Sequence, residues 1–442
     1  MKKVLISILM TLVLVGLTAC SAVAPTDIPT ITGELMGFQN GVLQSELQRL
    51  DSPYVKTTDQ DELVDGNSAF AFDLYQQLKQ AEGNLFYSPY SISLALAMTY
   101  AGARSETEQQ MADTLNFILE QEKLHNAFNW LDQQLAQRGE GAQGKDGEGF
   151  RLNVANSIWG QEDYQFLADF LDVLAENYGA GLRGLDFINQ PEESRQIINR
   201  WVEEQTEGRI KDLIPKGSID AEIRLVLANA IYFNAAWEHQ FNEDSTIDMP
   251  FHLLDGDTIY VPTMRGGGSL NYADGNGYQA VELPYDGGQL SMVILLPDEG
   301  NFSSFENSLD AQLVSDIIQN MESQEGSLTM PKFEFESEMS LKETLAAMGM
   351  PVAFSASANF SGMDGKTGKD SLYIGDVIHK AFVAVDENGT EAAAATAVIM
   401  VGKAPPADPP VNFNMDRPFI FLIRDIETDS ILFVGRVLNP NA

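Results

Sequence analysis

The 442-residue sequence predicts an α+β fold in which helices pack on large, mostly antiparallel β-sheets. One observation supports this class, and a second bears on the number of domains. Stretches with helical periodicity dominate the first half of the chain and strand-like runs dominate the second half, a distribution that favours α+β over alternating βαβ units. In addition, no convincing linker or internal repeat divides residues 67–442, so we expect them to form a single domain.

The expected helices are stretches in which apolar residues recur every three or four positions. Ser88-Pro89 ahead of one apolar stretch, and Thr107 ahead of another, are typical helix starts. These helices occupy residues 68–80, 91–101, 106–116, 167–178, 191–206 and 340–348.

The expected strands are short runs rich in β-branched and aromatic residues. They occupy residues 225–233, 278–282, 290–296, 327–335, 377–385, 419–424 and 431–437.

The charge balance excludes one class of partner. The chain has 27 Lys and Arg residues against 64 Asp and Glu residues, which gives a formal net charge of −37. Such an excess of acid is repelled by phosphate backbones and by anionic lipid surfaces. We therefore expect no nucleic-acid partner, and any membrane attachment should be covalent or hydrophobic.

Common signatures of catalysis and of metal binding are missing. One cysteine and four histidines, with no His-Glu-x-x-His, argue against a zinc hydrolase and a multi-cysteine metal site. Residues 267–271 lack the final glycine of a nucleophile elbow, and residues 362–375 match neither a phosphate loop nor a calcium loop. The sequence does not support an enzyme, and we expect neither a cofactor nor a metal ion.

The N-terminus has the features of an export signal. Two lysines precede a mostly apolar run of 14 residues, 4–17, which is too short for a stable membrane span but suits a secretory signal. The run ends in Leu17-Thr18-Ala19-Cys20, which resembles the bacterial lipobox, where cleavage precedes a cysteine that is then lipidated. We expect residues 1–19 to be a lipoprotein signal peptide. The alternative is an ordinary secretory signal with an unrelated cysteine.

Lipidation of Cys20 would place the protein outside the cytoplasm, in the bacterial cell envelope or on the cell surface. Residues 20–66 contain few clustered apolar residues and are predicted to form a lipid-anchored tether, with one weak helix around residues 42–50. The alternative is that they form part of the fold.

Residues 386–403 combine an alanine-rich run with small polar residues. By propensity alone, residues 391–397 favour a helix. The segment follows a strand-like run, however, and four prolines crowd into residues 405–410 after it. Taken by itself, it would be a short surface helix or an alanine-rich linker.

Several segments, in the right order along the chain, are similar to segments of the serpin family of serine protease inhibitors. They are residues 84–92, 99–103, 227–238, 328–333, 413–419 and 433–440. The resemblance covers essentially all of residues 67–442. It implies the serpin fold, with an exposed and insertable reactive loop at about residues 387–412.

The resemblance also implies a mechanism. A serine protease attacks the loop and is acylated by the residue before the scissile bond. The freed loop then enters the main sheet as an added strand, which traps the protease in a covalent complex and consumes the metastable inhibitor. A central strand cannot contain proline, and residues 390–403 contain none, so the sequence satisfies this demand.

Individual residues match serpin positions. The hinge of the reactive loop would comprise Glu387, Gly389, Thr390, Glu391, Ala392, Ala393, Ala394 and Ala395. A hydrogen-bonded gating cluster is expected beneath the strands that open, with an aromatic residue where insertion begins: Ser88, Ser91, Asn229, His379 and Trp237. The alternative is that these are satisfied core polar groups and a core tryptophan.

Counting sixteen residues beyond Glu387, as is usual in the family, places the reactive bond between Lys403 and Ala404. A lysine there suits a trypsin-like protease with an acidic specificity pocket. Cleavage after Met400 or Val401 is the alternative and would favour chymotrypsin- or elastase-like targets.

The small residues of the hinge favour an inhibitory serpin that acts as a monomer on extracellular serine proteases. The alternative function is that of a non-inhibitory serpin, acting as a surface binding or chaperone-like protein.

Overall fold

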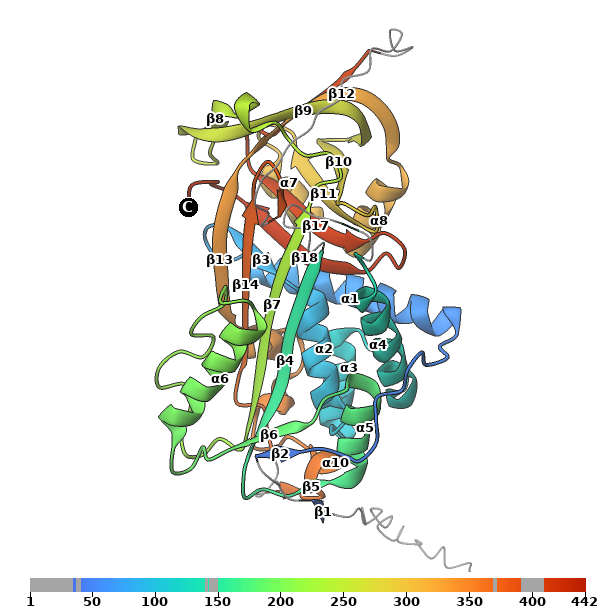
Figure 1. The fold of residues 1–442 in the computed structure, drawn as a ribbon, viewed down its shortest axis with the longest axis vertical. Coiled ribbons are helices and arrows are strands. Elements are labelled where there is room, and N and C mark those ends of the chain that lie inside the picture. Colours follow the sequence, from blue (N-terminus) through green and yellow to red (C-terminus); the bar gives the residue numbers. More distant parts are fainter. Residues whose placement is uncertain (1–34, 37–40, 140–141, 143–149, 369–371, 391–408) are drawn as a thin grey trace, which may run out of the picture. The chain divides into compact units, whose positions relative to one another are not determined.

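The fold was analysed in a computed structural model, which describes residues 35–36, 41–139, 142, 150–368, 372–390 and 409–442. All of them lie in one compact unit that starts at Gly33 (Figure 1). The predicted signal peptide, Cys20, hinge residues 391–395 and the reactive bond Lys403–Ala404 lie outside the described residues. None of the described helices is both long enough and apolar enough to cross a membrane.

Helices dominate the first half of the chain, as predicted. The helices are α1 (Thr57–Leu78), α2 (Pro89–Tyr100), α3 (Ser105–Leu115), α4 (Gln121–Ala136), α5 (Ala168–Tyr178), α6 (Pro191–Gln205), α7 (Phe302–Ser308), α8 (Ala311–Gln319), α9 (Lys342–Met348) and α10 (Ser361–Asp364).

A seven-stranded sheet with long central strands occupies the middle and lower part of the view in Figure 1. Its spatial order is β13 (Phe333–Ser340), β14 (Val377–Val385), β15 (Gly389–Thr390), β7 (Leu225–Ala236), β4 (Arg151–Gln161), β6 (Leu182–Leu185) and β2 (Val42–Leu43).

A nine-stranded sheet packs at one end. Its path is β16 (Val411–Asn414), β12 (Glu322–Pro331), β9 (Thr258–Gly275), β10 (Tyr278–Pro284), β11 (Leu290–Pro297), β17 (Phe419–Asp425), β18 (Ile431–Val437) and β3 (Leu85–Tyr87), with β8 (Ile247–His252) beside β9. A two-stranded sheet pairs β1 (Leu35–Met36) with β5 (Phe166–Leu167). Most strand pairs are antiparallel, which confirms the predicted α+β class.

Helix α2 lies at the centre of the core. Ser88 caps its N-terminus by accepting a hydrogen bond from the Ser91 backbone N–H, and Pro89 occupies the first turn, where its missing N–H costs nothing. All of its residues are buried, and it contacts β7 and β4 of one sheet and β18 of the other. The helix therefore joins the two sheets through apolar packing.

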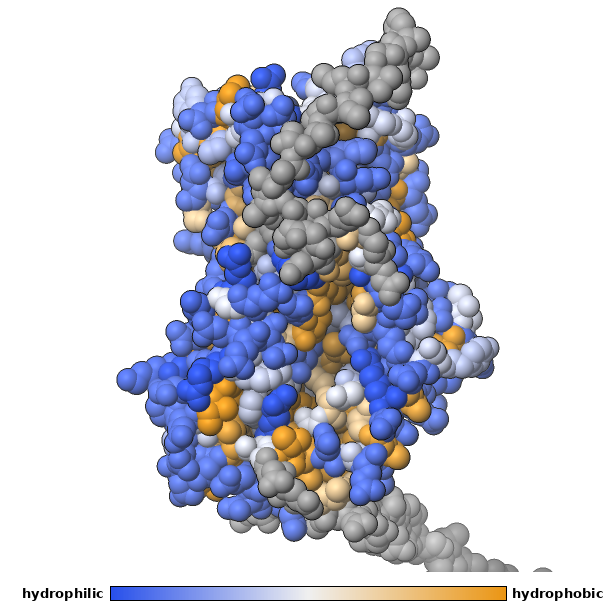
Figure 2. Space-filling model, in the orientation of Figure 1, coloured by the Kyte–Doolittle hydropathy of each residue, from blue (hydrophilic) through white to orange (hydrophobic). Residues whose placement is uncertain are grey.

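Helix α6 covers the opposite face of the seven-stranded sheet (Figure 1). Its apolar side packs on three neighbouring strands and forms a second hydrophobic core, which we call the α6 cluster. The cluster includes Ala155, Trp159, Ile198, Val202, Ala228 and Ala230, with Ile378 packed against it. Beside α6, hydrophobic surface runs down the middle of the face shown in Figure 2 and is bordered by hydrophilic residues.

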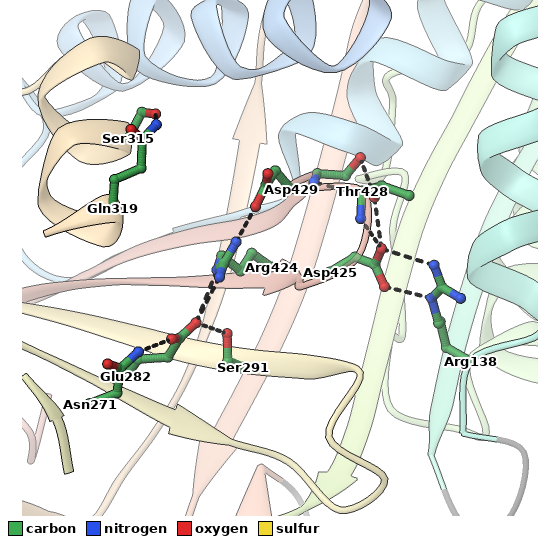
Figure 3. A network of polar contacts seen from close by, with 11 residues as sticks. Arg138, Asn271, Glu282, Ser291, Ser315, Gln319, Arg424, Asp425, Thr428 and Asp429 are labelled. Carbon is green, nitrogen blue, oxygen red and sulfur yellow. Dashed lines mark hydrogen bonds and ion pairs between the residues drawn. The ribbon is translucent and has the colours of Figure 1, made fainter. Parts of the chain in front are cut away.

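Paired charges hold the strands of the nine-stranded sheet in register (Figure 3). Arg424 on β17 lies 3.0 Å from the Glu282 carboxylate on β10 and also binds Asp429. Next to it, the Arg138 guanidinium bonds the buried Asp425 carboxylate at 2.6 Å. Each buried charge has a partner, which is the condition for ionic groups in a core.

The structure corrects the predicted start of the domain at residue 67. Helix α1 begins at Thr57, and the helix expected around residues 42–50 is instead the short strand β2 followed by irregular chain. Leu43 pairs with Leu182 of β6, and Arg49 bonds Asn129 on α4 at 2.8 Å. Residues 41–66 thus belong to the fold, because an otherwise open sheet edge and the side of α4 bind them.

Three long elements were not predicted: helix α4 and strands β4 and β9. Strand β4 carries Asn153 and Asn156 among small and apolar residues, and β9 contains three consecutive glycines, so neither shows clean strand propensity. Neighbouring strands on both sides impose the extended conformation.

We expect Leu43→Ala to lower the free energy of unfolding by about 2–3 kcal/mol, because Leu43 is only 2% exposed and its removal leaves a cavity. Leu47, which is 45% exposed on the same segment, provides the control: Leu47→Ala should change stability by less than about 0.5 kcal/mol. Urea denaturation followed by tryptophan fluorescence measures both. Equal, small effects would contradict the inclusion of this segment in the fold.

Candidate functional site at the seam of the seven-stranded sheet

Strands β14 and β7 meet along a short parallel seam. Residues Val377–Ala381 of β14 pair with residues Leu227–Ile231 of β7, and the two strands do not pair with each other beyond these residues. Parallel pairing is slightly weaker per residue than antiparallel pairing. The seam is therefore a weak line in the middle of the sheet.

Strand β15 enters between β14 and β7 beyond the end of the seam. Thr390 pairs antiparallel with Val385 on one side and with Ala235 on the other, so it occupies the gap between the two strands. A Cβ atom on Gly389 would lie 2.1 Å from the Ala235 carbonyl oxygen, so only glycine fits at this point. A chain that continued from Thr390 along the seam would be antiparallel to both neighbours.

The turn that delivers β15, residues 386–390, is called the hinge turn below. Its Glu387 carboxylate lies 2.7 Å from Lys332 Nζ and accepts a 2.7 Å hydrogen bond from the Thr246 hydroxyl. Burial raises the Glu387 pKa, but the contacts to Lys332 and Thr246 outweigh this effect, and the pKa lies below its usual value. Burial also raises the pKa of the neighbouring Asp386.

Two stacked aromatic residues hold the hinge turn. The rings of Trp237 and Tyr285 lie 4.7 Å apart and nearly parallel. Trp237 donates from its indole N–H to the Asp386 carbonyl at 3.0 Å, and the Tyr285 hydroxyl lies 2.7 Å from the Thr390 hydroxyl. Thr390 is thus held in a buried position with its only polar side-chain atom satisfied.

On the α2 side of the seam lies a buried polar cluster, which we call the inner-face cluster: Ser88, Ser91, Asn156, Asn229 and His379. Asn229 donates from its side-chain nitrogen to the Ser91 carbonyl at 2.8 Å and to the Ser91 hydroxyl at 2.7 Å. His379, on the other strand of the seam, bonds Asn229 directly. The cluster therefore joins β14, β7 and the start of α2.

The hydrogen bonds determine the protonation state of His379. The Ser88 backbone N–H donates to Nε2 at 3.1 Å, so Nε2 must be unprotonated and Nδ1 carries the proton that it donates to Asn229. Complete burial lowers the His379 pKa to about 3. The imidazole is therefore neutral, and a second proton would break the bond to Ser88.

The structure brings the predicted gating residues Ser88, Ser91, Asn229 and His379 together in one hydrogen-bonded cluster. Trp237 lies apart from this cluster and contacts the hinge turn. That turn contains three of the predicted hinge residues, Glu387, Gly389 and Thr390.

Four further residues of the site were not identified from the sequence: Asn156, Thr246, Tyr285 and Lys332. Asn156 lies on the missed strand β4, Thr246 directly precedes β8, and Tyr285 directly follows β10. Lys332 lies within a segment that resembles serpins, residues 328–333, but nothing there indicated its contact with Glu387. The only signal for Tyr285 is its place before Gly287-Gly288, which indicates a turn. Within the described ranges, no group of three or more His, Cys, Asp or Glu residues could hold a metal ion.

Comparisons with known proteins agree with this architecture. Residues 65–440 match the family model for serpins, described as serine protease inhibitors. The chain is 40% identical over 379 residues to an uncharacterized serpin-like protein of Thermococcus kodakarensis, covering 86% of each chain. It is 39% identical over 381 residues to a leukocyte elastase inhibitor of Xenopus laevis, covering 84% of this chain and 97% of that one.

Among solved structures, the chain is similar to the thermophilic serpin tengpin in its native state. The TM-score is 0.78 at 31% sequence identity, over 88% of this chain and 97% of that one.

The stability of the folded protein should fall as the pH drops from 6.5 towards 3. The unfolded chain takes up a proton at His379 below about pH 6.5, whereas the folded chain does so only near pH 3. Between these two pH values, each such histidine lowers the free energy of unfolding by about 1.4 kcal/mol for every pH unit. Burial also lowers the pKa of His125 to about 3, so it adds a second contribution of the same sign.

His379→Gln should therefore reduce the slope of unfolding free energy against pH by about half, and should cost about 1–3 kcal/mol at pH 7 because its partners lose a hydrogen bond. Urea midpoints at pH 7, 6 and 5 measure both effects. The exposed His239 provides the control, and His239→Gln should leave slope and stability unchanged. An unaltered slope in His379→Gln would contradict a buried neutral imidazole.

Proposed function

The chain belongs to the serpin family, and from that premise we propose that it is a single-use inhibitor of extracellular serine proteases. The protease would be acylated at the reactive loop and trapped when the loop enters the seven-stranded sheet. The observation that carries this proposal is the seam, with β15 already paired antiparallel to both β14 and β7.

Insertion would replace one weak interface by two stronger ones. The parallel contact of β14 with β7 is lost, and a new strand forms antiparallel ladders with both. Some ten added ladder bonds at ~1 kcal/mol each give a driving force on the order of ten kcal/mol. That gain is comparable to the stability of a whole domain, which makes the intact form metastable with respect to insertion.

Two barriers would oppose premature insertion. On the inner face, separating β14 from β7 breaks the bond between His379 and Asn229. On the outer face, the incoming strand must pass beneath α6 and divide the α6 cluster, in which Ala228 and Ala230 of β7 and Ile378 of β14 lie together. Both interactions lie on the seam itself, so breaking them would delay insertion and would subtract from the driving force estimated above.

We place the reactive bond at Lys403–Ala404, which directs the inhibitor to trypsin-like proteases. Lipidation of Cys20 would hold the protein at the outside of the cell, where such proteases act. The resemblance of residues 17–20 to the lipobox supports this second part of the proposal.

Thr390→Arg should convert the inhibitor into a substrate. Thr390 is already buried in the intact protein, where it is 1% exposed and bonded to Tyr285. An arginine there would bury an unpaired charge and so expel β15 from between β14 and β7, which removes the pairing from which insertion would start. A barrier increase of ~1.4 kcal/mol already slows insertion tenfold, so we expect the ratio of cleaved inhibitor to trapped protease, and with it the stoichiometry of inhibition, to rise; the ratio should increase at least about tenfold. Thr390→Ser keeps the hydroxyl and should behave like the wild type. An unchanged stoichiometry in Thr390→Arg would contradict strand insertion.

Trypsin should form an SDS-stable adduct with the wild type, and Lys403→Ala should abolish it. Mass spectrometry of the trypsin-treated protein would locate the bond, and a cut elsewhere would move the specificity assignment. Cleavage should also stabilise the protein by on the order of ten kcal/mol, because the freed loop fills the sheet. Calorimetry compares the two forms. Cleaved protein no more stable than intact protein, together with the absence of an adduct, would favour a non-inhibitory binding role.

Cys20→Ala should release soluble protein into the medium or extracellular fraction, since the mature chain would lose its lipid. Fractionation of expressing bacteria and mass spectrometry of the mature N-terminus measure this. Wild-type protein that is wholly soluble with an unmodified N-terminus would contradict the anchor.

A further inference from the structure

An arginine is held between two tryptophans at the edge of the seven-stranded sheet. The Arg183 guanidinium on β6 lies 5.5 Å from the ring centre of Trp159 on β4 and 5.1 Å from that of Trp201 on α6. The two indole rings meet edge to face at 5.8 Å. Stacking on an indole orients a guanidinium at little cost in hydration, since guanidinium is weakly hydrated.

These three side chains line a pocket of about 350 Å³ between α6 and the sheet edge. The other lining residues are Gly41, Gly184, Leu185, Ile197, Arg200 and Glu204. The volume falls at the lower end of the range for small-molecule sites, and the lining has the mixture such sites use, an apolar and aromatic wall with a few polar groups.

The charges of this pocket differ from those of the chain as a whole. Arg183 and Arg200 both line it, and in the part of the chain that the structure describes, neither guanidinium has a hydrogen-bond or carboxylate partner. Glu204 is the single acid among the lining residues. In a chain of net charge −37, two arginines left without carboxylates at one pocket form a local site for an anion.

We propose that this pocket binds a small planar aromatic acid. The ring would pack against Trp201, Leu185 and Ile197, and the carboxylate would accept hydrogen bonds from Arg183, whose planar donors match a carboxylate. An occupant would contact α6 and the neighbouring strands β4 and β6 together, and would therefore stabilise the docking of α6 on the sheet.

The probes are 2-naphthoate and its neutral amide, 2-naphthamide, which have nearly the same shape and differ in charge. Isothermal titration calorimetry on the intact protein should show saturable 2-naphthoate binding at a single site. Arg183→Gln should weaken it at least about tenfold, the loss of one charge-assisted hydrogen-bond pair. Arg183→Lys keeps the charge but loses the planar arrangement of donors, so its affinity for 2-naphthoate should lie between those of the wild type and Arg183→Gln. Binding of 2-naphthamide should be weaker and should change less than about twofold in Arg183→Gln.

Arg265, an exposed arginine on β9, provides the matched control, and Arg265→Gln should bind 2-naphthoate like the wild type. Circular dichroism and urea midpoints would establish that each variant is folded. Absence of saturable 2-naphthoate binding to the wild type, or equal binding by Arg183→Gln, would overturn the proposal. Neither measurement involves a protease, so its outcome is independent of the inhibitory function proposed above.

Discussion

The architecture depends on a parallel contact between two strands that lie in the middle of a sheet yet pair over only a few residues. Val377–Ala381 of β14 and Leu227–Ile231 of β7 form this contact, and beyond it the strands diverge. A sheet usually gains stability from each additional ladder, so a central gap is an unfavourable feature that something else must maintain. The hydrogen bonds of the inner-face cluster and the apolar contacts of the α6 cluster both stabilise the sheet around this gap.

The two-residue period of a strand separates the restraints on the seam. Asn229 and His379 point to the face covered by α2 and form directional hydrogen bonds there. Their neighbours Ala228, Ala230 and Ile378 point to the other face and pack without direction beneath α6. A hydrogen bond is lost over a fraction of an ångström, whereas apolar contact area declines gradually. In the insertion proposed above, the hydrogen bonds of the inner face would therefore oppose the first separation of the strands, and the apolar contacts of the outer face would oppose their further movement.

Much of the architecture was accessible from the sequence because local pattern and tertiary context agree there. Helix α2 is an example: the Ser88-Pro89 start and the apolar run predict it, and its burial follows from composition. Strand β14 is another, with its alternation of buried positions and its His379. The meeting of Ser88, Ser91, Asn229 and His379 was expected through the family resemblance rather than from spacing, since long stretches of chain separate them.

What the sequence did not predict is set by contacts between distant residues. Tyr285 belongs to the site because the end of β10 happens to face Trp237, and nothing in its neighbours indicates this. Residues 41–66 looked like a tether because their few apolar side chains are scattered. Leu43 is nevertheless buried against a sheet edge that other parts of the chain build. Trp237 lies 48 residues before Tyr285, and Leu182 lies 139 residues beyond Leu43, so neither contact could be predicted from local sequence.

The place of β2 gives the long sheet a polarity. Strand β2 pairs with β6 at Arg183, and Arg183 lies opposite Trp159 of β4. Trp159 in turn lies opposite Val226 at the start of β7. Thr390 pairs near the other end of the same strand, at Ala235, nine residues away. At about 3.3 Å per residue, the two sites are separated by roughly 30 Å of continuous β-structure. The sheet therefore keeps the two sites apart: a surface that held the chain before β2 would lie at one end of β7, and the hinge turn, packed on Trp237 and Tyr285, lies at the other end, beyond the reach of that attachment.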